Sequence, residues 1–170
     1  MKITKQQALN QIEELKKYIE EYDNEEWVKI DYSVIKKELF DKYGVKPFKI
    51  MKRKMRDEND EVWNSINYFD AQKEAKKRGY RLPNVREMLL LMEAYEEEKQ
   101  KVSYKDKEFL GIEELSYNED VYLEWIEGLN SIAFTRGGTW DDTSNGGVFS
   151  LSLSYLLTNT YLSIGFRCAQ

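Results

Sequence analysis

The sequence predicts an α+β protein in which helices precede a C-terminal part built from short strands and loops. Four stretches carry apolar residues at every third or fourth position, which is the spacing of amphipathic helices. In "VFSLSLS", Phe149, Leu151 and Leu153 alternate with serines, as in a strand with one buried face. From Gly137 onward the composition changes: residues 137–170 hold five of the nine glycines and only three charged residues. At 170 residues, the chain is long enough to bury a hydrophobic core.

The first two helices are expected at residues 4–23 and 31–44. Thr4 is a suitable N-cap for the first, whose apolar stripe consists of Ala8, Ile12, Leu15, Ile19 and Tyr22. Gly44 suits the end of the second, because glycine readily adopts the left-handed conformation found there. We expect residues 1–43 to form an N-terminal helical segment, either a cap on the following domain or its attachment to something larger. Residues 44–170 are expected to form the main domain.

The middle of the chain predicts a strand, a turn and two further helices. The basic run at 49–56 alternates in a way that favours a strand with a solvated face over a phosphate-binding patch. "DEND" at 57–60 is typical of a hairpin turn and lacks the glycine and the spaced glutamate of a calcium-binding EF-hand loop. Residues 69–80 predict a helix that ends at Gly79. Residues 82–101 predict another helix, with Asn84 as N-cap and Glu87 as its capping-box partner.

Composition excludes most enzyme chemistry. The chain has no histidine and one cysteine, Cys168, which removes Ser-His-Asp and Cys-His catalysis, internal disulfides and cysteine-based zinc sites. Cys168 is expected to be a small buried apolar residue, and Asp141 and Asp142 are not expected to be a catalytic pair. A net charge of -5 argues against a nucleic-acid partner. Neither a signal peptide nor a membrane-spanning stretch is predicted, so no membrane insertion is expected.

Three motifs in order resemble the C-type-lectin-like fold of the formylglycine-generating-enzyme type. They are "GYRLPNVREMLLLMEAY", "FTRGGTW" and the closing "IGFRCA", and they cover roughly residues 79–170. Enzymes of this class use a reactive cysteine pair, whereas this chain has only Cys168. The resemblance therefore implies the fold without the oxidase activity.

The C-terminal sequence also resembles the variable region of proteins diversified by diversity-generating retroelements. That family has a tail of the form R-G-G-x-W-N-N … N-x-G-x-F-x-L-N-L-N-N … N-x-N-N-N-I-G-F-R, which fits from Arg136 to Arg167 without a gap. The resemblance, together with the outward side of the "VFSLSLS" alternation, assigns a set of variable ligand-binding residues. They are Asp141, Asp142, Ser150, Ser152, Ser154, Tyr155, Asn159, Tyr161, Leu162 and Ser163. The variable region is expected at about residues 137–170, and within it we call residues 137–163 the tail segment.

The genetic code provides a check on this resemblance. These retroelements mutate template adenines, so an asparagine codon can change its first two bases and keep a pyrimidine in the third. Asp, Ser, Tyr and Leu are reachable in this way, whereas Lys, Glu, Gln, Met and Trp are not. None of those five residue types occurs from Asp141 to Ile164, although Lys and Glu are abundant earlier in the chain.

The resemblance implies a non-enzymatic protein that binds a protein ligand on a cell or virus surface, without metal or cofactor. Two alternatives stay open: a formylglycine-generating-like oxidase and a calcium-dependent sugar-binding lectin. The absent signal peptide fits both a cytoplasmic protein and a virion component assembled inside a host. The sequence does not set the oligomeric state. The expected core residues of the tail are Trp140, Phe149, Leu151, Leu153 and Phe166, and the serines and tyrosines among the variable residues are expected to share one exposed patch.

Overall fold

The computed structural model describes residues 4–99, 108–115, 123–128, 134–136, 151–152 and 156–170, and of residues 18–25 the backbone alone. The described chain mixes helix and sheet, in agreement with the predicted α+β class. Its elements in order are α1 (Lys5–Glu26), β1 (Trp27–Ile30), α2 (Lys37–Tyr43), β2 (Phe48–Met51), α3 (Tyr68–Lys77), α4 (Val85–Lys99), β3 (Leu123–Ile126), β4 (Phe134–Arg136), β5 (Leu151–Ser152) and β6 (Ile164–Gly165).

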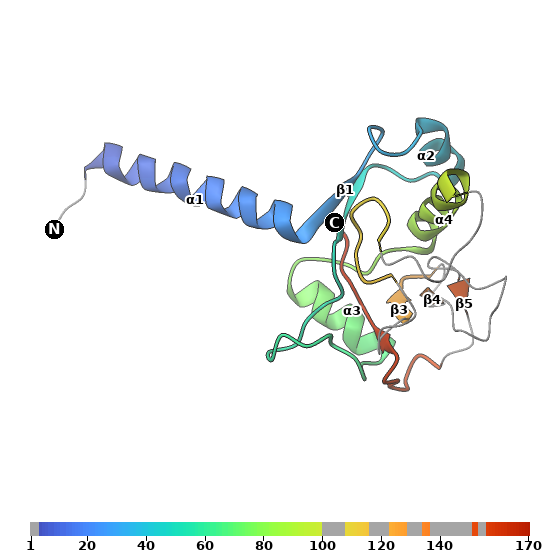
Figure 1. Ribbon diagram of the computed structural model, residues 1–170. Helices are drawn as coiled ribbons and strands as arrows, with labels where there is room; N and C mark the ends of the chain where they lie inside the picture. The colour runs from blue at the N-terminus through green and yellow to red at the C-terminus, as the bar shows by residue number, and fades with distance from the viewer. Residues whose placement is uncertain (1–3, 100–107, 116–122, 129–133, 137–150, 153–155) are drawn as a thin grey trace.

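Helix α1 extends away from the rest of the molecule and carries the N-terminus to its far end (Figure 1). Thr4 caps it as predicted: its side-chain oxygen accepts a hydrogen bond from the backbone N–H of Gln7, and the Gln7 side chain accepts one from the N–H of Thr4. The helix continues three residues beyond the predicted end and runs directly into β1. None of residues 4–17 is buried, so this part of the helix adds nothing to the core.

Strands β1 and β2 form a two-stranded antiparallel sheet, with Ile30 opposite Phe48. Helix α2 begins at Lys37, later than the predicted residue 31, because Asp31 folds the chain into a turn. Its carboxylate accepts a hydrogen bond from the backbone N–H of Ser33, and its carbonyl accepts one from Val34. Gly44 ends α2 in the left-handed conformation at φ 63°, as predicted.

Residues 27–43 pack into the same core as the segments that follow. Ile30, Leu39 and Phe40 belong to one buried cluster with Phe48 and with residues of α4. The pairing of β1 with β2 therefore crosses the boundary between residues 43 and 44 that the sequence suggests. The division of the chain into two parts stays a prediction, and this packing favours a boundary closer to Trp27.

The basic run is not the strand with a solvated face that its alternation predicts. Strand β2 ends at Met51, and Lys54 is buried with 1% of its surface exposed. Its ammonium group donates a hydrogen bond to the carbonyl of Glu114, and Arg56 forms an ion pair with the Glu114 carboxylate. These acceptors come from a distant part of the chain. They offset the free-energy cost of burying the charged Lys54 side chain. The predicted turn after the run is confirmed, since Arg56 and Val62 are paired across it.

Helices α3 and α4 begin at asparagine caps. Asn67 accepts a hydrogen bond from the backbone N–H of Asp70, and Gly79 follows α3 with φ 81°. In α4 the predicted capping box is confirmed: Asn84 accepts from the N–H of Glu87, and the Glu87 carboxylate accepts from the N–H of Asn84. Buried α4 residues are Val85, Glu87, Met88, Leu90, Leu91 and Tyr95, so the apolar stripe faces the core as predicted.

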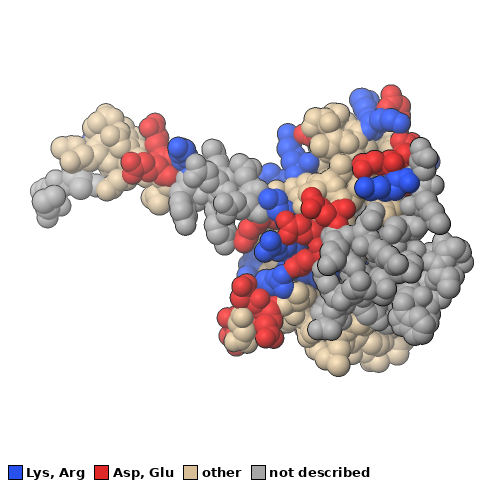
Figure 2. All heavy atoms as spheres, in the orientation of Figure 1, with Lys and Arg blue, Asp and Glu red and all other residues tan. Residues whose placement is uncertain are grey.

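A second sheet has four strands in the order β5-β4-β3-β6. Strand β3 pairs antiparallel with β4 and parallel with β6, and all four of its residues are buried. On the face shown in Figure 2, acidic and basic side chains of the described residues are interspersed. Among the described residues, no helix is both long and apolar enough to cross a membrane.

Candidate functional site

The four-stranded sheet brings the two ends of the tail segment to the same central strand. Strand β4 ends at Arg136, immediately before the segment, and β6 begins at Ile164, immediately after it. Both strands lie beside β3, where Glu124 is opposite Arg136 on one side and Gly165 on the other. The segment therefore leaves and rejoins the sheet at neighbouring positions, next to a buried strand.

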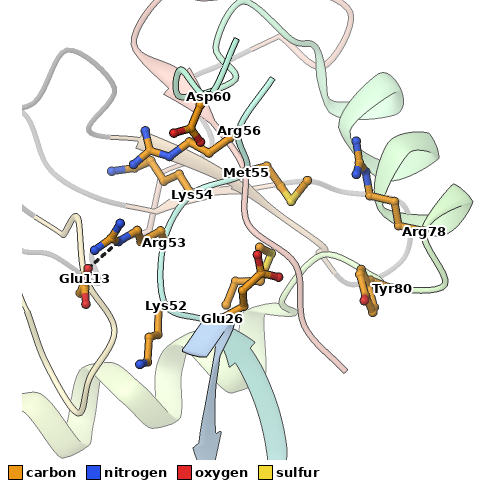
Figure 3. Close-up of a pocket in the computed structure, with 11 residues that line it drawn as sticks. Glu26, Lys52, Arg53, Lys54, Met55, Arg56, Asp60, Arg78, Tyr80 and Glu113 are labelled. Atoms are coloured by element: carbon orange, nitrogen blue, oxygen red, sulfur yellow. Dashed lines mark hydrogen bonds and ion pairs between the residues drawn. The ribbon is translucent and has the colours of Figure 1, made fainter. Parts of the chain in front are cut away.

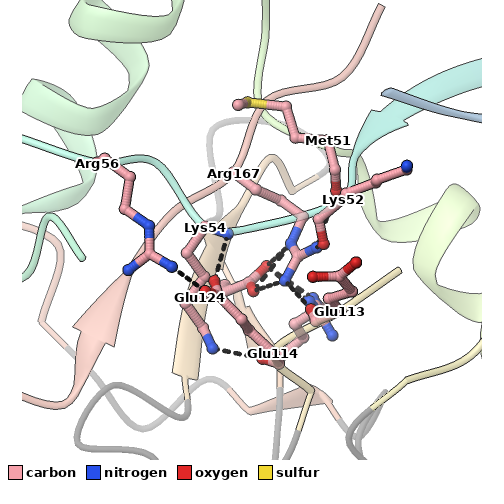
Figure 4. Close-up of polar contacts among 9 residues, drawn as sticks. Met51, Lys52, Lys54, Arg56, Glu113, Glu114, Glu124 and Arg167 are labelled. Carbon is pink, nitrogen blue, oxygen red and sulfur yellow. Dashed lines mark hydrogen bonds and ion pairs between the residues drawn. The ribbon is translucent and has the colours of Figure 1, made fainter. Parts of the chain in front are cut away.

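One buried carboxylate binds the arginines that flank the tail segment. Arg136 donates to Glu124 with its Nε at 2.9 Å, and Arg167 donates to Glu124 with its Nη2 at 2.8 Å. All three side chains are buried, Arg167 with 0% exposure. Arg167 also donates to the backbone carbonyls of Met51, Lys52 and Glu113 (Figure 4). We call Glu124, Arg136 and Arg167 the Glu124 cluster, and it ties the tail to β2 as well as to β3.

The Glu124 cluster is charged at neutral pH. Burial alone would raise the pKa of Glu124, but the positive charges of Arg136 and Arg167 outweigh it and hold that pKa at about 2. Burial lowers the pKa of Arg136 to about 10 against the favourable effect of Glu124, so this guanidinium also stays charged. A carboxylate shared by two guanidinium groups is stable in the interior only while every partner is present.

Apolar side chains complete the rigid base of the tail segment. Phe166 and Trp125 belong to one buried cluster, and the Trp125 indole donates a hydrogen bond to the carbonyl of Ile66 at 2.8 Å. Cys168 lies in the same cluster, as predicted, and burial raises the pKa of its thiol to about 12. The predicted burial of Phe166 is confirmed, whereas Leu151 is half-buried. Three other expected core residues lie outside the described residues: Trp140, Phe149 and Leu153.

Five of the ten predicted variable residues are described. Asn159 and Leu162 are exposed, Leu162 with 76% of its surface. Ser152, Tyr161 and Ser163 are half-buried, whereas the expected patch required them to be exposed. The remaining five, Asp141, Asp142, Ser150, Ser154 and Tyr155, lie outside the described residues. The assignment of these ten residues as ligand contacts therefore stays a prediction.

Tyr161 lies on this surface and also packs against the buried residues beneath it. Its ring lies 6.5 Å from the ring of Trp125, and its hydroxyl accepts a hydrogen bond from the backbone N–H of Leu156 at 3.2 Å. Strand β5, which contains Ser152, is at the edge of the sheet. The Tyr161 side chain and the backbone of Ser152 are therefore held by structure that the sequence does not reveal.

The described end of the tail segment lies beside the start of α3. The carbonyl of Leu157 accepts a hydrogen bond from the N–H of Tyr68, and the carbonyl of Tyr161 accepts one from Ser65. Next to these contacts, Phe69 keeps 52% of its surface exposed and Leu156 keeps 64%. These two apolar side chains, together with Leu162, are suited to contact another protein. Phe69 was not predicted as part of this surface, because it precedes the tail segment by many positions in the sequence.

Glu124 was not among the predicted site residues, although the sequence contains a signal for it. Glu124 stands between Leu123 and Trp125 in "VYLEWIEG", where the apolar neighbours predict a buried strand. A carboxylate in such a strand requires cationic partners, because an unpaired buried charge is very costly. The only cations in the strand-rich C-terminal part are Arg136 and Arg167.

A separate pocket of about 720 Å³ lies between the basic run and the residues before α4 (Figure 3). Its charged lining is mixed: Lys52, Arg53, Lys54, Arg56 and Arg78 are basic, and Glu26, Asp60 and Glu113 are acidic. Part of this charge is already paired, since Arg53 donates to Glu113 at 2.7 Å. None of the described residues of the tail segment lines it. Among the described residues, no group of three or more Cys, Asp or Glu side chains is arranged to hold a metal ion.

The described residues form a mixed helix-and-sheet protein. In it, the Glu124 cluster and the apolar cluster around Trp125 support a C-terminal surface. No protein-family model matches the chain, and no curated protein matches it. Among solved structures, the chain is similar to one described as the Major Tropism Determinant U1 Variant. The identity is 14%, the TM-score is 0.40, and the likeness covers 76% of this chain and 46% of that chain. The chain thus spans less than half the length of that protein.

Proposed function

We propose that this chain is a non-enzymatic binding protein with a C-type-lectin-like fold of the formylglycine-generating-enzyme type. Its tail segment is diversified by a retroelement through adenine-directed mutagenesis and binds a protein ligand on a cell or virus surface. The observation that carries the proposal is the Glu124 cluster. Arg136 and Arg167, which flank the segment in the family pattern, share one buried carboxylate.

In this arrangement the residues that maintain the fold are different from the residues that can be substituted. Binding residues commonly sit on segments that a rigid scaffold positions. Here the flanking residues Arg136, Phe166 and Arg167 are buried, whereas Asn159 and Leu162 are exposed. Substitution at exposed positions changes stability by about 0.5 kcal/mol or less in most proteins. A gene could therefore vary these codons and still encode a folded protein.

The chemistry of the surface favours a protein ligand. The tail segment has two charged residues, Asp141 and Asp142, and many small polar residues with two tyrosines. Tyr supplies a large, rigid contact area at low entropic cost, while Ser and Asn form adaptable hydrogen bonds. Exposed Leu156, Leu162 and Phe69 add apolar area beside them. With so few charges, binding should depend only weakly on salt concentration.

The structure gives the oxidase alternative no reactive thiol to use. Cys168 is the chain's one cysteine, it is fully buried, and its pKa is raised to about 12. A nucleophilic or redox-active cysteine needs a lowered pKa and access to its substrate. We therefore propose binding alone, either on a virus particle or inside the cell that makes the protein.

The test is to sequence the gene and its surroundings in many isolates of the source population. The proposal expects a reverse transcriptase gene nearby and an adenine-richer near-copy of the region that encodes the tail segment. Differences between isolates should fall on the codons of the ten predicted variable residues. The codons of Arg136, Phe166 and Arg167 provide the internal control and should not vary. A genome with neither element, or variation spread evenly along the gene, would contradict the proposal.

A further inference from the structure

Helix α1 carries an apolar stripe that the core does not cover. Leu9, Ile12 and Leu15 keep 45%, 48% and 60% of their surfaces exposed. The opposite face is polar: Gln6 donates a hydrogen bond to Asn10 at 3.0 Å, and the side chains of Glu13 and Glu14 are exposed there. The helix is thus amphipathic, with its apolar side in water.

The stripe has the spacing of a coiled coil. Ala8, Ile12 and Leu15 follow one another at steps of four and three, and the sequence continues the steps to Ile19 and Tyr22. This is the heptad pattern, with isoleucines at the a positions and Ala, Leu and Tyr at the d positions. The apolar a and d positions run from Ala8 to Tyr22, which is about two heptads within α1, a helix of 22 residues and about 33 Å.

A helix of this kind gains little stability by itself. Most helices in proteins are stabilised by packing of their apolar face, and isolated helices of moderate length are marginal in water. The Thr4–Gln7 capping box supports the first turn only. Residues 4–17 contribute no buried side chain to the domain, so their apolar face is available to another helix that carries a matching stripe.

We propose that α1 pairs in parallel with α1 of a second copy of this chain. A second copy supplies the same heptad spacing, and isoleucine at a with leucine at d favours two parallel strands. In this register Lys16 lies beside Gln11 of the other copy, so no like-charged pair flanks the apolar layers from Ala8 to Tyr22.

This pairing does not depend on the function proposed above, because it involves a different part of the chain. It has a consequence for any ligand displayed in many copies on a surface. A dimer presents two tail segments at once, and the second binding event then occurs at a high effective concentration.

The mass of the full chain in solution tests the proposal. Light scattering after size exclusion, at several protein concentrations, should give twice 20.3 kDa at the highest concentrations. The double variant Ile12→Asp/Leu15→Asp should give 20.3 kDa throughout. Its melting temperature at low concentration should match that of the unaltered chain, since neither residue is buried in the domain.

The matched control is Gln6→Asp/Asn10→Asp, which adds the same two carboxylates to the polar face and should remain dimeric. Direction is tested by Ala8→Cys, which should form an intermolecular disulfide on mild oxidation, whereas Gln7→Cys on the outer face should not. A 20.3 kDa mass at every concentration, or a dimer that survives Ile12→Asp/Leu15→Asp, overturns the proposal. A dimer in which Ala8→Cys does not cross-link overturns the parallel direction.

Discussion

Two adjacent pieces of the C-terminal tail differ sharply in burial. Residues 164–169 are all buried, and Ile164, Phe166 and Arg167 retain no exposed surface. Residues 156–163 contain no buried residue, and Leu162 keeps 76% of its surface exposed. The change from buried scaffold to accessible surface therefore occurs between two neighbouring residues, Ser163 and Ile164, where strand β6 begins.

The difference has a physical cause in the contacts of each piece. Residues 164–169 pair with β3, join the apolar cluster around Trp125 and place Arg167 on Glu124. Residues 156–163 attach through backbone groups, which any residue other than proline supplies, and through the half-buried side chains of Leu157 and Tyr161, which pack against the Trp125 cluster.

Replacing Glu124 by Ala should destabilise the protein by about 3–5 kcal/mol, because it leaves Arg136 and Arg167 buried without a carboxylate. The measurement is the free energy of unfolding from urea denaturation. Glu97→Ala is the matched control, since it removes a carboxylate from an exposed ion pair with Lys36 and should change stability little. Similar effects of the two substitutions would show that the Glu124 cluster does not hold the tail.

Acid should weaken the same cluster. The pKa of Glu124 is held at about 2, below its usual value of 4.5, so as pH falls the unfolded chain takes up a proton before the folded chain does. The contribution of Glu124 is therefore complete above about pH 5 and is lost as pH falls toward 2, a loss of about 3 kcal/mol.

Urea denaturation at a series of pH values measures this loss. Asp31 also has a lowered pKa because Lys29 and Ser33 bind its carboxylate, so acid affects more than one site. The comparison with Glu124→Gln isolates the contribution of Glu124, because the variant cannot titrate at this position. Parallel pH profiles of the two proteins would rule out the linkage.

Two neighbouring substitutions within residues 156–163 should have unequal effects. Tyr161→Ala should cost about 1–3 kcal/mol, since it removes a half-buried ring beside Trp125 and an acceptor for the N–H of Leu156. Leu162→Ala should change stability by about 0.5 kcal/mol or less. Thermal melts of the two variants measure the difference. Equal melting temperatures would place Tyr161 on the surface alone, as the sequence pattern first suggested.

Local signals in the sequence predicted the helix ends well. Asn84 and Glu87 form the capping box that their spacing indicated, and Gly44 adopts the left-handed conformation expected of it. Such features depend on residues three or four positions apart, so the local sequence is enough to predict them. The turn at Asp31, which delays α2, also depends on near neighbours, but the apolar spacing concealed it.

Features that depend on distant contacts were harder to predict. Lys54 is buried because Glu114 accepts its hydrogen bond, and the two residues are 60 positions apart. Alternation along the basic run gave no sign of that partner. Of the candidate site, the buried flanking motif around Phe166 was predicted correctly, whereas the carboxylate that holds Arg136 and Arg167 was not. A charge inside an apolar strand shows that a partner is needed, but it does not say where along the chain that partner lies.

The burial of Cys168 gives residues 164–169 their own chemical reporter. This thiol is the chain's one cysteine, has no exposed surface and has its pKa raised to about 12. A thiol-specific reagent can reach it only after this C-terminal segment separates from its neighbours. The rate of alkylation in native buffer then follows the population of that opened state. One unmodified protein can thus show how often thermal fluctuation releases the end of the chain that fixes the tail segment.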